Sequence, residues 1–356
     1  MISYSPTRGR ALFRLIFKLP LPLLLVLSSA SVSCDLGPSV VTPKDFSDFR
    51  RSFPDPVYWV DNDQLVFLGF KREGAGSKSV DKDGSAQQLS LYIIDVRTGR
   101  AQTYAERTYP RFCYSRGYIA YGKQNRDGKT FTMWAGKLGE EQESQELTEQ
   151  IIRKGRGLGN VACRYLDEEV TYRQARNASY RILKLYPEHG FLEFQIQGYL
   201  PDQPILYHKT GESEPMEIQG YKATDAMILL NQQVEYYPFK EAYFMWSSKA
   251  WWLYPDGKTE PQPLPRGPWD ECYRTCAHFT PTKTGMLVNY FLRGSERLLL
   301  MQGDNVHTVT TRRMVGRETV SPNGCLVAFN YVADTPKPMI QEWSIAVVDV
   351  CGRGES

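Results

Sequence analysis

From residue 64 onward, short runs of apolar and β-branched residues that end in an aromatic side chain recur along the chain. Seven of them stand out: Gln64–Phe67, Tyr118–Tyr121, Glu169–Tyr172, Pro204–Tyr207, Glu241–Phe244, Met286–Tyr290 and Leu326–Phe329. Runs of this composition are typical of β-strands. Their final aromatic residues lie 35 to 54 residues apart, with a mean of about 44. The pattern therefore predicts one supersecondary unit repeated along the chain.

Turn residues separate the strands within these units. Val60–Asp63 and Ser321–Gly324 precede an apolar strand, and the strand Leu91–Val96 runs into the turn Arg97–Gly99. Turns of the Asp-Gly or Thr-Gly kind suit antiparallel hairpins. A unit of about 44 residues matches one four-stranded blade, so the predicted fold class is all-β, a β-propeller with seven blades. Six or eight blades are also compatible with these intervals.

The last unit resembles a known repeat. Ser321–Phe329, followed by Ile345–Val350, is similar to the repeat of TolB-type (WD40-like, PD40) propellers, in which Ser-Pro-Asp-Gly precedes an apolar strand, a hairpin and a strand ending in Asp. Asp61–Gly99 matches with Asp-Asn-Asp in place of that turn, whereas Leu166–Ile218 departs from the pattern. The resemblance implies binding of another envelope protein or support of an attached hydrolase. This chain has no room for such a hydrolase.

A propeller ring needs its two ends joined, because open first and last blades would expose unpaired strand edges. The final unit offers few strands before Ser356, and the β-branched run Ser39–Thr42 precedes the first clear unit. We therefore expect residues near Val40 and Val41, or the segment Phe46–Phe53, to pair with Ile345–Val350.

The first residues have the order of a secretory signal. Arg8, Arg10, Arg14 and Lys18 precede the apolar run Leu19–Leu27 and the small residues Ser28–Ser33. An uncleaved membrane anchor is the alternative, although the run is shorter than the roughly 20 residues of a membrane span. The predicted organisation is a signal peptide at 1–33, a lipid-tethered linker at 34–48 and one propeller domain at 49–356.

Cys34 follows the small residues directly, and Ser31–Cys34 resembles the lipobox of bacterial lipoproteins with Ser in the place of the usual Leu. This resemblance implies that Cys34 is acylated and becomes the mature N-terminus. Ordinary cleavage with a free or paired Cys34 thiol is the alternative. Either reading places the protein outside the cytoplasm, and acylation holds it at a membrane, facing the periplasm or the cell surface.

Removing the signal changes the charge argument. The formal net charge of +3 includes its four basic residues, so the remainder lies near −1. The basic character that would suggest a nucleic-acid partner is lost. The chain is expected to be monomeric and to bind no nucleic acid.

Six cysteines remain after Cys34, an even number that suits an oxidising compartment. Cys325 and Cys351 flank the last hairpin, Cys113 and Cys163 precede equivalent strands of two neighbouring units, and Cys272 and Cys276 are close in sequence. Each of these is predicted to be a disulfide pair. A metal pair at Cys272 and Cys276 is the alternative.

Catalytic chemistry is weakly signalled. His189, His208, His278 and His307 are far apart in sequence, without metal-ligand spacing, and no cofactor motif is present. The densest aromatic stretch contains Trp246, Trp251, Trp252 and Tyr254, which form either a stacking surface for a ligand or the packing between blades.

The chain is therefore predicted to be an exported, membrane-anchored lipoprotein that serves as a binding scaffold in the cell envelope, for an envelope protein or an extracellular ligand. The alternative is a propeller enzyme, a carbohydrate lyase or hydrolase, with its site at the channel mouth. Polar and titratable residues gathered there would favour the enzyme.

Overall fold

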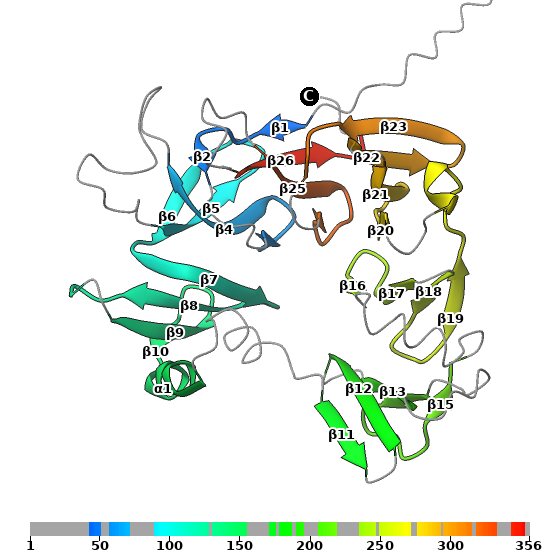
Figure 1. Cartoon of the computed structure of the whole chain (residues 1–356), viewed down its shortest axis with the longest axis horizontal. Helices are drawn as coiled ribbons and strands as arrows, with labels where there is room; N and C mark the ends of the chain where they lie inside the picture. The colour runs from blue at the N-terminus through cyan, green and yellow to red at the C-terminus, as the bar shows by residue number, and fades with distance from the viewer. Residues whose placement is uncertain are drawn as a thin grey trace, which may run out of the picture. The chain divides into compact units, whose positions relative to one another are not determined.

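The computed structural model describes residues 43–50, 57–71, 89–127, 130–154, 171–175, 178–186, 190–195, 206–218, 235–246, 249–271, 276–292, 295–314, 318–332 and 343–352. All of them lie in one compact unit, Pro38–Ser356. They form a β-propeller, and its described part comprises six antiparallel sheets (Figure 1).

The first three sheets follow one another in chain order. The first contains β2 (Phe49–Arg50), β3 (Tyr58–Trp59), β4 (Gln64–Lys71), β5 (Ser90–Asp95) and β6 (Ala101–Ala105). The second contains β7 (Thr108–Ser115), β8 (Tyr118–Gln124), β9 (Phe131–Lys137) and β10 (Gln142–Glu143), and α1 (Gln145–Lys154) follows it. The third contains β11 (Thr171–Ala175), β12 (Ala178–Tyr186), β13 (Gly190–Gln195), β14 (Leu206–Lys209) and β15 (Met216–Glu217).

The remaining sheets complete the fold. The fourth contains β16 (Glu235–Tyr237), β17 (Ala242–Trp246), β18 (Ala250–Leu253) and β19 (Thr259–Gln262), followed by the short helix η1 (Pro268–Glu271). The fifth contains β20 (Ala277–Pro281), β21 (Met286–Leu292), β22 (Ser295–Gln302) and β23 (Asn305–Thr310). The sixth, called the closing sheet, contains β24 (Thr319–Val320), β25 (Leu326–Val332), β26 (Trp343–Asp349) and β1 (Lys44–Asp45).

The prediction of seven blades is not met by the described residues, which form six sheets. Five of the seven predicted strands are β4, β8, β17, β21 and β25, each in the second position of its sheet. The other two, Glu169–Tyr172 and Pro204–Tyr207, overlap β11 and β14, which belong to the same sheet. The short interval between these two runs therefore reflects one five-stranded sheet, which the pattern counted as two blades.

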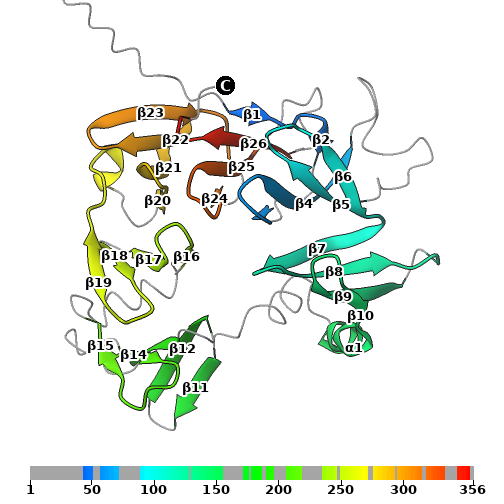
Figure 2. The ribbon, with the colours of Figure 1, turned by 180° about the vertical axis from the view of Figure 1, so that it is seen from behind.

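The closing sheet joins the two ends of the propeller. Lys44 pairs with Val347 and Asp45 with Ala346, and the Phe46 N–H donates to the Ile345 carbonyl at 2.9 Å. Figures 1 and 2 show β1 alongside β26 from both sides. The predicted closure is confirmed for residues 44–46, while Val40, Val41 and 51–53 lie outside the described residues. The propeller thus begins before the predicted boundary at residue 49.

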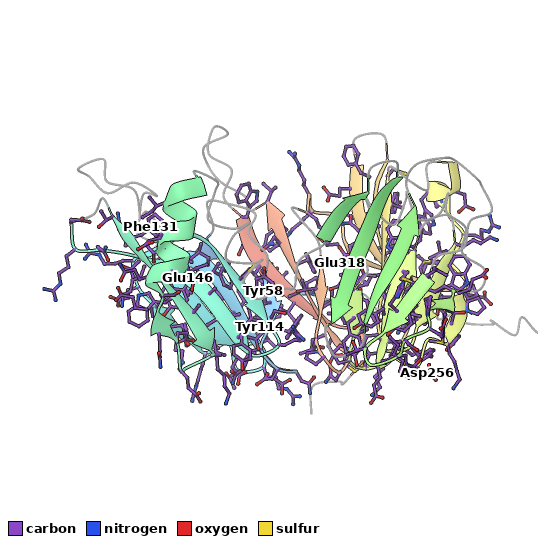
Figure 3. All side chains as sticks on the ribbon, turned by 90° about the horizontal axis from the view of Figure 1, so that it is seen from below. Tyr58, Tyr114, Phe131, Glu146, Asp256 and Glu318 are labelled. Atoms are coloured by element: carbon purple, nitrogen blue, oxygen red, sulfur yellow. A yellow bond between two sulfur atoms is a disulfide. The ribbon has the colours of Figure 1, made fainter. Side chains whose placement is uncertain are left out.

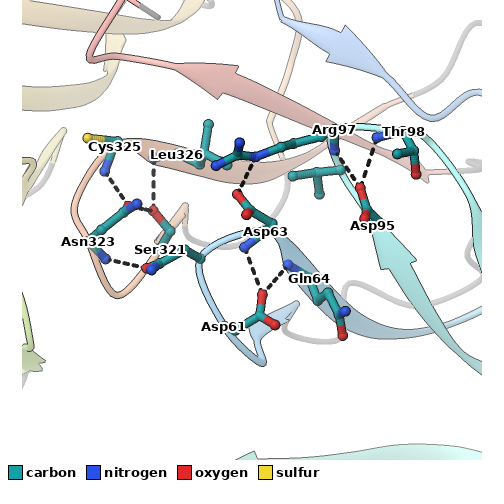
Figure 4. A network of polar contacts seen from close by, with 12 residues as sticks. Asp61, Asp63, Gln64, Asp95, Arg97, Thr98, Ser321, Asn323, Cys325 and Leu326 are labelled. Atoms are coloured by element: carbon teal, nitrogen blue, oxygen red, sulfur yellow. Dashed lines mark hydrogen bonds and ion pairs between the residues drawn. The ribbon is translucent and has the colours of Figure 1, made fainter.

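Turns at the start of the first and closing sheets explain the repeat motif (Figure 4). The Asp61 carboxylate accepts hydrogen bonds from the backbone N–H groups of Asp63 and Gln64, at 2.8 and 2.7 Å. Ser321 has the equivalent role, since its hydroxyl accepts from the Leu326 N–H at 2.9 Å. The Asn323 N–H also donates to Asn62 Oδ1 at 2.8 Å and so connects the two turns. Asp-Asn-Asp therefore performs the same local task as Ser-Pro-Asn-Gly.

The core consists of apolar side chains packed between neighbouring sheets. Leu65, Phe67 and Ile94 of the first sheet are fully or almost fully buried against Ile345 and Val347 of the closing sheet. A second cluster joins Leu298 and Leu300 of β22 to Phe329 of β25, among others. The predicted disulfide between Cys325 and Cys351 is present, with the two Cα atoms 5.1 Å apart.

Helix α1 packs Leu147 beside Met133 of β9. Among the helices of the described ranges, none combines the length and apolar character needed to cross a membrane.

Candidate functional site

A groove opens where the fifth sheet meets the closing sheet, and we call it the closure groove. Its volume is about 510 Å³. One wall carries Val306, Thr308 and Thr310 of β23, and the other carries Phe329 of β25 and Ala346 of β26. The groove adjoins an apolar cluster in which Leu298, Leu300 and Phe329 pack together.

The register of β23 helps to create this opening. Thr308 pairs with Leu299 while Thr310 pairs with Leu298, so Val309 is an extra residue that forms a β-bulge. A bulge bends its strand and increases the local twist. Val306, at the outer end of the same strand, remains 47% exposed although it is apolar. β23 is the last strand of its sheet in the described structure, so it presents a strand edge beside the groove.

The N-terminal strand supplies part of the groove. Pro43 and Asp45 line it, and the Asp45 carboxylate forms an ion pair with Arg312 at 2.8 Å. The Arg312 guanidinium also lies over the Tyr331 ring, 4.7 Å from its centroid. The charges of Asp45 and Arg312 therefore neutralise each other. The groove is left with threonine hydroxyls and apolar surface for a ligand.

A buried polar cluster lies at the same boundary between sheets. Glu318 directly precedes β24 and is labelled in Figure 3. Its side chain has no exposed surface. Its carboxylate accepts a hydrogen bond from the Thr280 hydroxyl at 2.6 Å, and it lies 3.2 Å from His278 Nδ1 and 3.4 Å from Asn289 Nδ2. These three partners belong to β20 and β21 of the fifth sheet. We call the four residues the Glu318 cluster.

The cluster keeps its carboxylate ionised despite burial. Burial raises the pKa of Glu318. The hydrogen bond and charge of His278, together with the hydrogen bond from the Thr280 hydroxyl, lower that pKa by a larger amount. The net result is a pKa below the ordinary value of 4.5. A buried carboxylate that accepts several hydrogen bonds is a recognised way to hold a charge in a protein interior.

The aromatic residues predicted as a binding surface belong mostly to the core. Trp246, Trp251 and Trp252 are buried. Tyr254 is partly buried and packs against the apolar cluster that contains Trp246 and Trp252. Alternate residues of β17 and β18 face the neighbouring sheets, which accounts for this burial. Burial of the three tryptophans agrees with the alternative, packing between blades, and Trp246 and Trp252 belong to an apolar cluster that joins the fourth and fifth sheets.

Trp252 borders a cavity of about 430 Å³ between the fourth and fifth sheets. Met286 and Met301 form another part of its lining. The Trp252 indole already donates to Gln262 Oε1 at 3.1 Å, and the Gln262 amide donates to the Pro263 carbonyl. Both side chains therefore already make a hydrogen bond within the protein.

Other predicted site residues are only partly covered by the structure. Cys34, Cys163, Cys272 and His189 lie outside the described residues. Cys113 and Cys276 are both disulfide-bonded, which is compatible with their predicted partners Cys163 and Cys272. Within the ranges that the structure describes, no three His, Cys, Asp or Glu side chains gather as metal ligands would.

The Glu318 cluster was missed by sequence reasoning. Glu318 follows Arg317 in an ordinary polar stretch, and its partners precede it by 29 to 40 residues. No spacing rule connects residues across two sheets. The sequence carries one signal for it. Glu318 is a charged residue directly before a β-branched strand and a blade turn, a position at which a buried charge is unusual.

Comparisons with known proteins assign no family to the chain. No family model matches the chain, and no curated protein matches it. TolB from Acinetobacter baumannii aligns with 11% identity and a TM-score of 0.30, over 72% of this chain and 59% of that one. The β-propeller domain of the trilobed protease from Pyrococcus furiosus, which has an open velcro topology, aligns with 9% identity, a TM-score of 0.26 and 80% of each chain.

A putative 6-phosphogluconolactonase from Bacteroides uniformis aligns with 9% identity and a TM-score of 0.35, over 78% of this chain and 94% of that one. Of the TolB structure, the chain spans 59%, which is less than two thirds of its length. Similarity at this level says nothing about ligand or activity.

Proposed function

We propose that this chain is an exported lipoprotein, anchored to a membrane through Cys34, whose β-propeller serves as a binding scaffold in the cell envelope. The observation that carries the proposal is the closure groove. It is built partly from Pro43 and Asp45, a short distance along the chain from Cys34. A partner held there would be kept close to the membrane that carries the anchor.

The proposed ligand is an extended segment of an envelope protein. Thr308 offers an exposed hydroxyl group and Val306 an exposed apolar side chain. The edge of β23 can add hydrogen bonds to a main chain, as in β-strand addition. Because Asp45 and Arg312 already pair, an uncharged stretch of polypeptide suits the groove better than an acidic or basic one.

Filling the groove should abolish this binding. Replacing Thr308 with Arg places a long charged side chain against the β23 wall, and we expect partner affinity to fall by at least about tenfold, or 1.4 kcal/mol. The measurement is photocrosslinking from a reactive amino acid at position 306 in native membranes. Thr103→Arg is the matched control, because Thr103 is also an exposed threonine on an outer strand, β6 of the first sheet.

Three outcomes decide the matter. A crosslinked partner that persists with Thr103→Arg and disappears with Thr308→Arg supports the groove. Crosslinks that survive both substitutions contradict it, as does the absence of any crosslink from position 306. Both variants must melt like the unmodified protein, which exposed surface substitutions normally do.

The anchor has its own test. If Cys34 is acylated, Cys34→Ser should yield an unprocessed or freely soluble product, because one short apolar leader without its lipid gives no stable membrane attachment. Membrane fractionation together with intact-mass measurement gives the answer. A wild-type mass without an acyl group rejects the lipoprotein proposal but leaves the groove proposal standing.

A further inference from the structure

The Glu318 cluster orients one side chain that reaches solvent. His278 is 21% exposed, whereas the Glu318 side chain is fully buried and Thr280 is 1% exposed. The imidazole also meets the Trp246 ring edge to face, with centroids 5.5 Å apart and an interplanar angle of 78°. A carboxylate on one side and an indole on the other therefore define where the ring lies.

Hydrogen-bond chemistry then determines the tautomer of His278. An ionised carboxylate only accepts hydrogen bonds, and the Thr280 hydroxyl already donates its proton to Glu318. The nearby ring nitrogen, Nδ1, must therefore carry a proton to interact favourably with either neighbour. When the imidazole is neutral, its lone pair is on Nε2.

Nε2 is available to a ligand. Among the described residues, His278 makes hydrogen bonds through Nδ1 alone, to Glu318 and Thr280. Within the described part of the chain, several buried polar atoms have no hydrogen-bond partner, and Nε2 of His278 does not belong to that group. Because 21% of the side chain is exposed, solvent reaches the imidazole. His307 differs, because its Nδ1 is buried without a hydrogen bond among the described residues.

We propose that His278 is the general base of a second functional site, which accepts a proton from water or from a hydroxyl-bearing small molecule bound at Nε2. In that step the O–H bond breaks, the proton adds to Nε2, and the electron pair remains on the oxygen. The Glu318 carboxylate stabilises the resulting imidazolium through Nδ1–H. Glu318 is a positioning residue in this arrangement, and the inference does not depend on the closure groove.

The first test measures the tautomer of His278 in the wild-type protein. Nitrogen NMR of histidine-labelled mature protein, at a pH where His278 is neutral, should show a protonated Nδ1 and an unprotonated Nε2. The opposite tautomer would overturn the proposal, because Nε2 could not then accept a proton. His278→Gln assigns the signal, and its amide N–H can still donate to Glu318.

The second test measures base chemistry with p-nitrophenyl acetate as the probe. The rate of p-nitrophenolate release by the mature protein should fall to the background level in His278→Gln and remain unchanged in the matched control His307→Gln. In Glu318→Gln the rate should fall by at least about tenfold, a modest part of what the orienting carboxylate contributes in other histidine–carboxylate pairs.

A purely structural role gives a different result. If the cluster only connects two sheets, release of p-nitrophenolate will be the same in the wild type, His278→Gln and His307→Gln, while stability alone changes. Should Glu318→Gln fail to fold, the comparison of His278→Gln with His307→Gln and the tautomer measurement still decide the question.

Discussion

A chain that lacks residues 35–50 should lose the stability of the whole propeller, by about 5 kcal/mol or more, since Phe46 and Phe49 are core residues whose individual loss costs about 3–5 kcal/mol each. Their side chains are 7% and 6% exposed. The deletion also removes the backbone carbonyls of both residues, which accept hydrogen bonds from the buried Ser344 hydroxyl at 3.0 and 3.2 Å. A buried hydroxyl without a partner adds a further penalty.

Thermal and denaturant unfolding of the mature chain would measure this effect. The matched control is deletion of residues 35–41, which shortens the tether and leaves β1 in place. That variant should melt like the unmodified protein. If the longer deletion also melts normally, the N-terminal strand does not close the propeller energetically, despite its pairing with β26.

Replacing Glu318 with Ala should destabilise the propeller by about 3 kcal/mol, because its removal leaves buried donors without an acceptor. Thr280 is 1% exposed, so its hydroxyl has no access to water. Glu318→Gln keeps the shape and one acceptor oxygen and should cost less. The control is Glu212→Ala, which removes an exposed ion pair with Lys209 and should change stability by no more than about 1 kcal/mol.

The same carboxylate predicts the direction of acid sensitivity. Because the pKa of Glu318 is lower in the folded protein than its ordinary value of 4.5, its contribution is complete above pH 4.5 and declines as the pH falls below that value. Burial raises the pKa of Glu296 on β22, so that group acts in the opposite direction and favours the folded state when protonated. In Glu318→Gln the loss of stability at acid pH should be smaller than in the wild type. An identical acid profile would contradict this assignment.

The success of the strand predictions has a physical basis in burial. β4, β17 and β25 are covered on both faces, so their residues are apolar almost without interruption and are easily recognised in sequence. The apolar run Pro204–Tyr207 overlaps β14, which is the fourth strand of its sheet. The composition of the run alone could not distinguish this strand from the first strands of a new blade.

Other features depend on which sheets become neighbours. The disulfide between Cys325 and Cys351 was predictable, because one hairpin holds both residues. The partners of Glu318 were not, since His278 and Asn289 reach it from another sheet. The burial of the tryptophans in β17 and β18 was not predictable either, because it depends on how closely the fifth sheet packs against these strands.

The pairing of β1 with β26 also determines the order of events during synthesis. Ser344 and Phe46, which share a hydrogen bond in the closing sheet, are separated by 298 residues. At usual translation rates, that separation corresponds to about 15–60 s between the emergence of the two ends. Contacts of such high sequence separation form late and slow the folding of a domain. The first strand of this protein therefore has no partner in the closing sheet until the last strand has been synthesised.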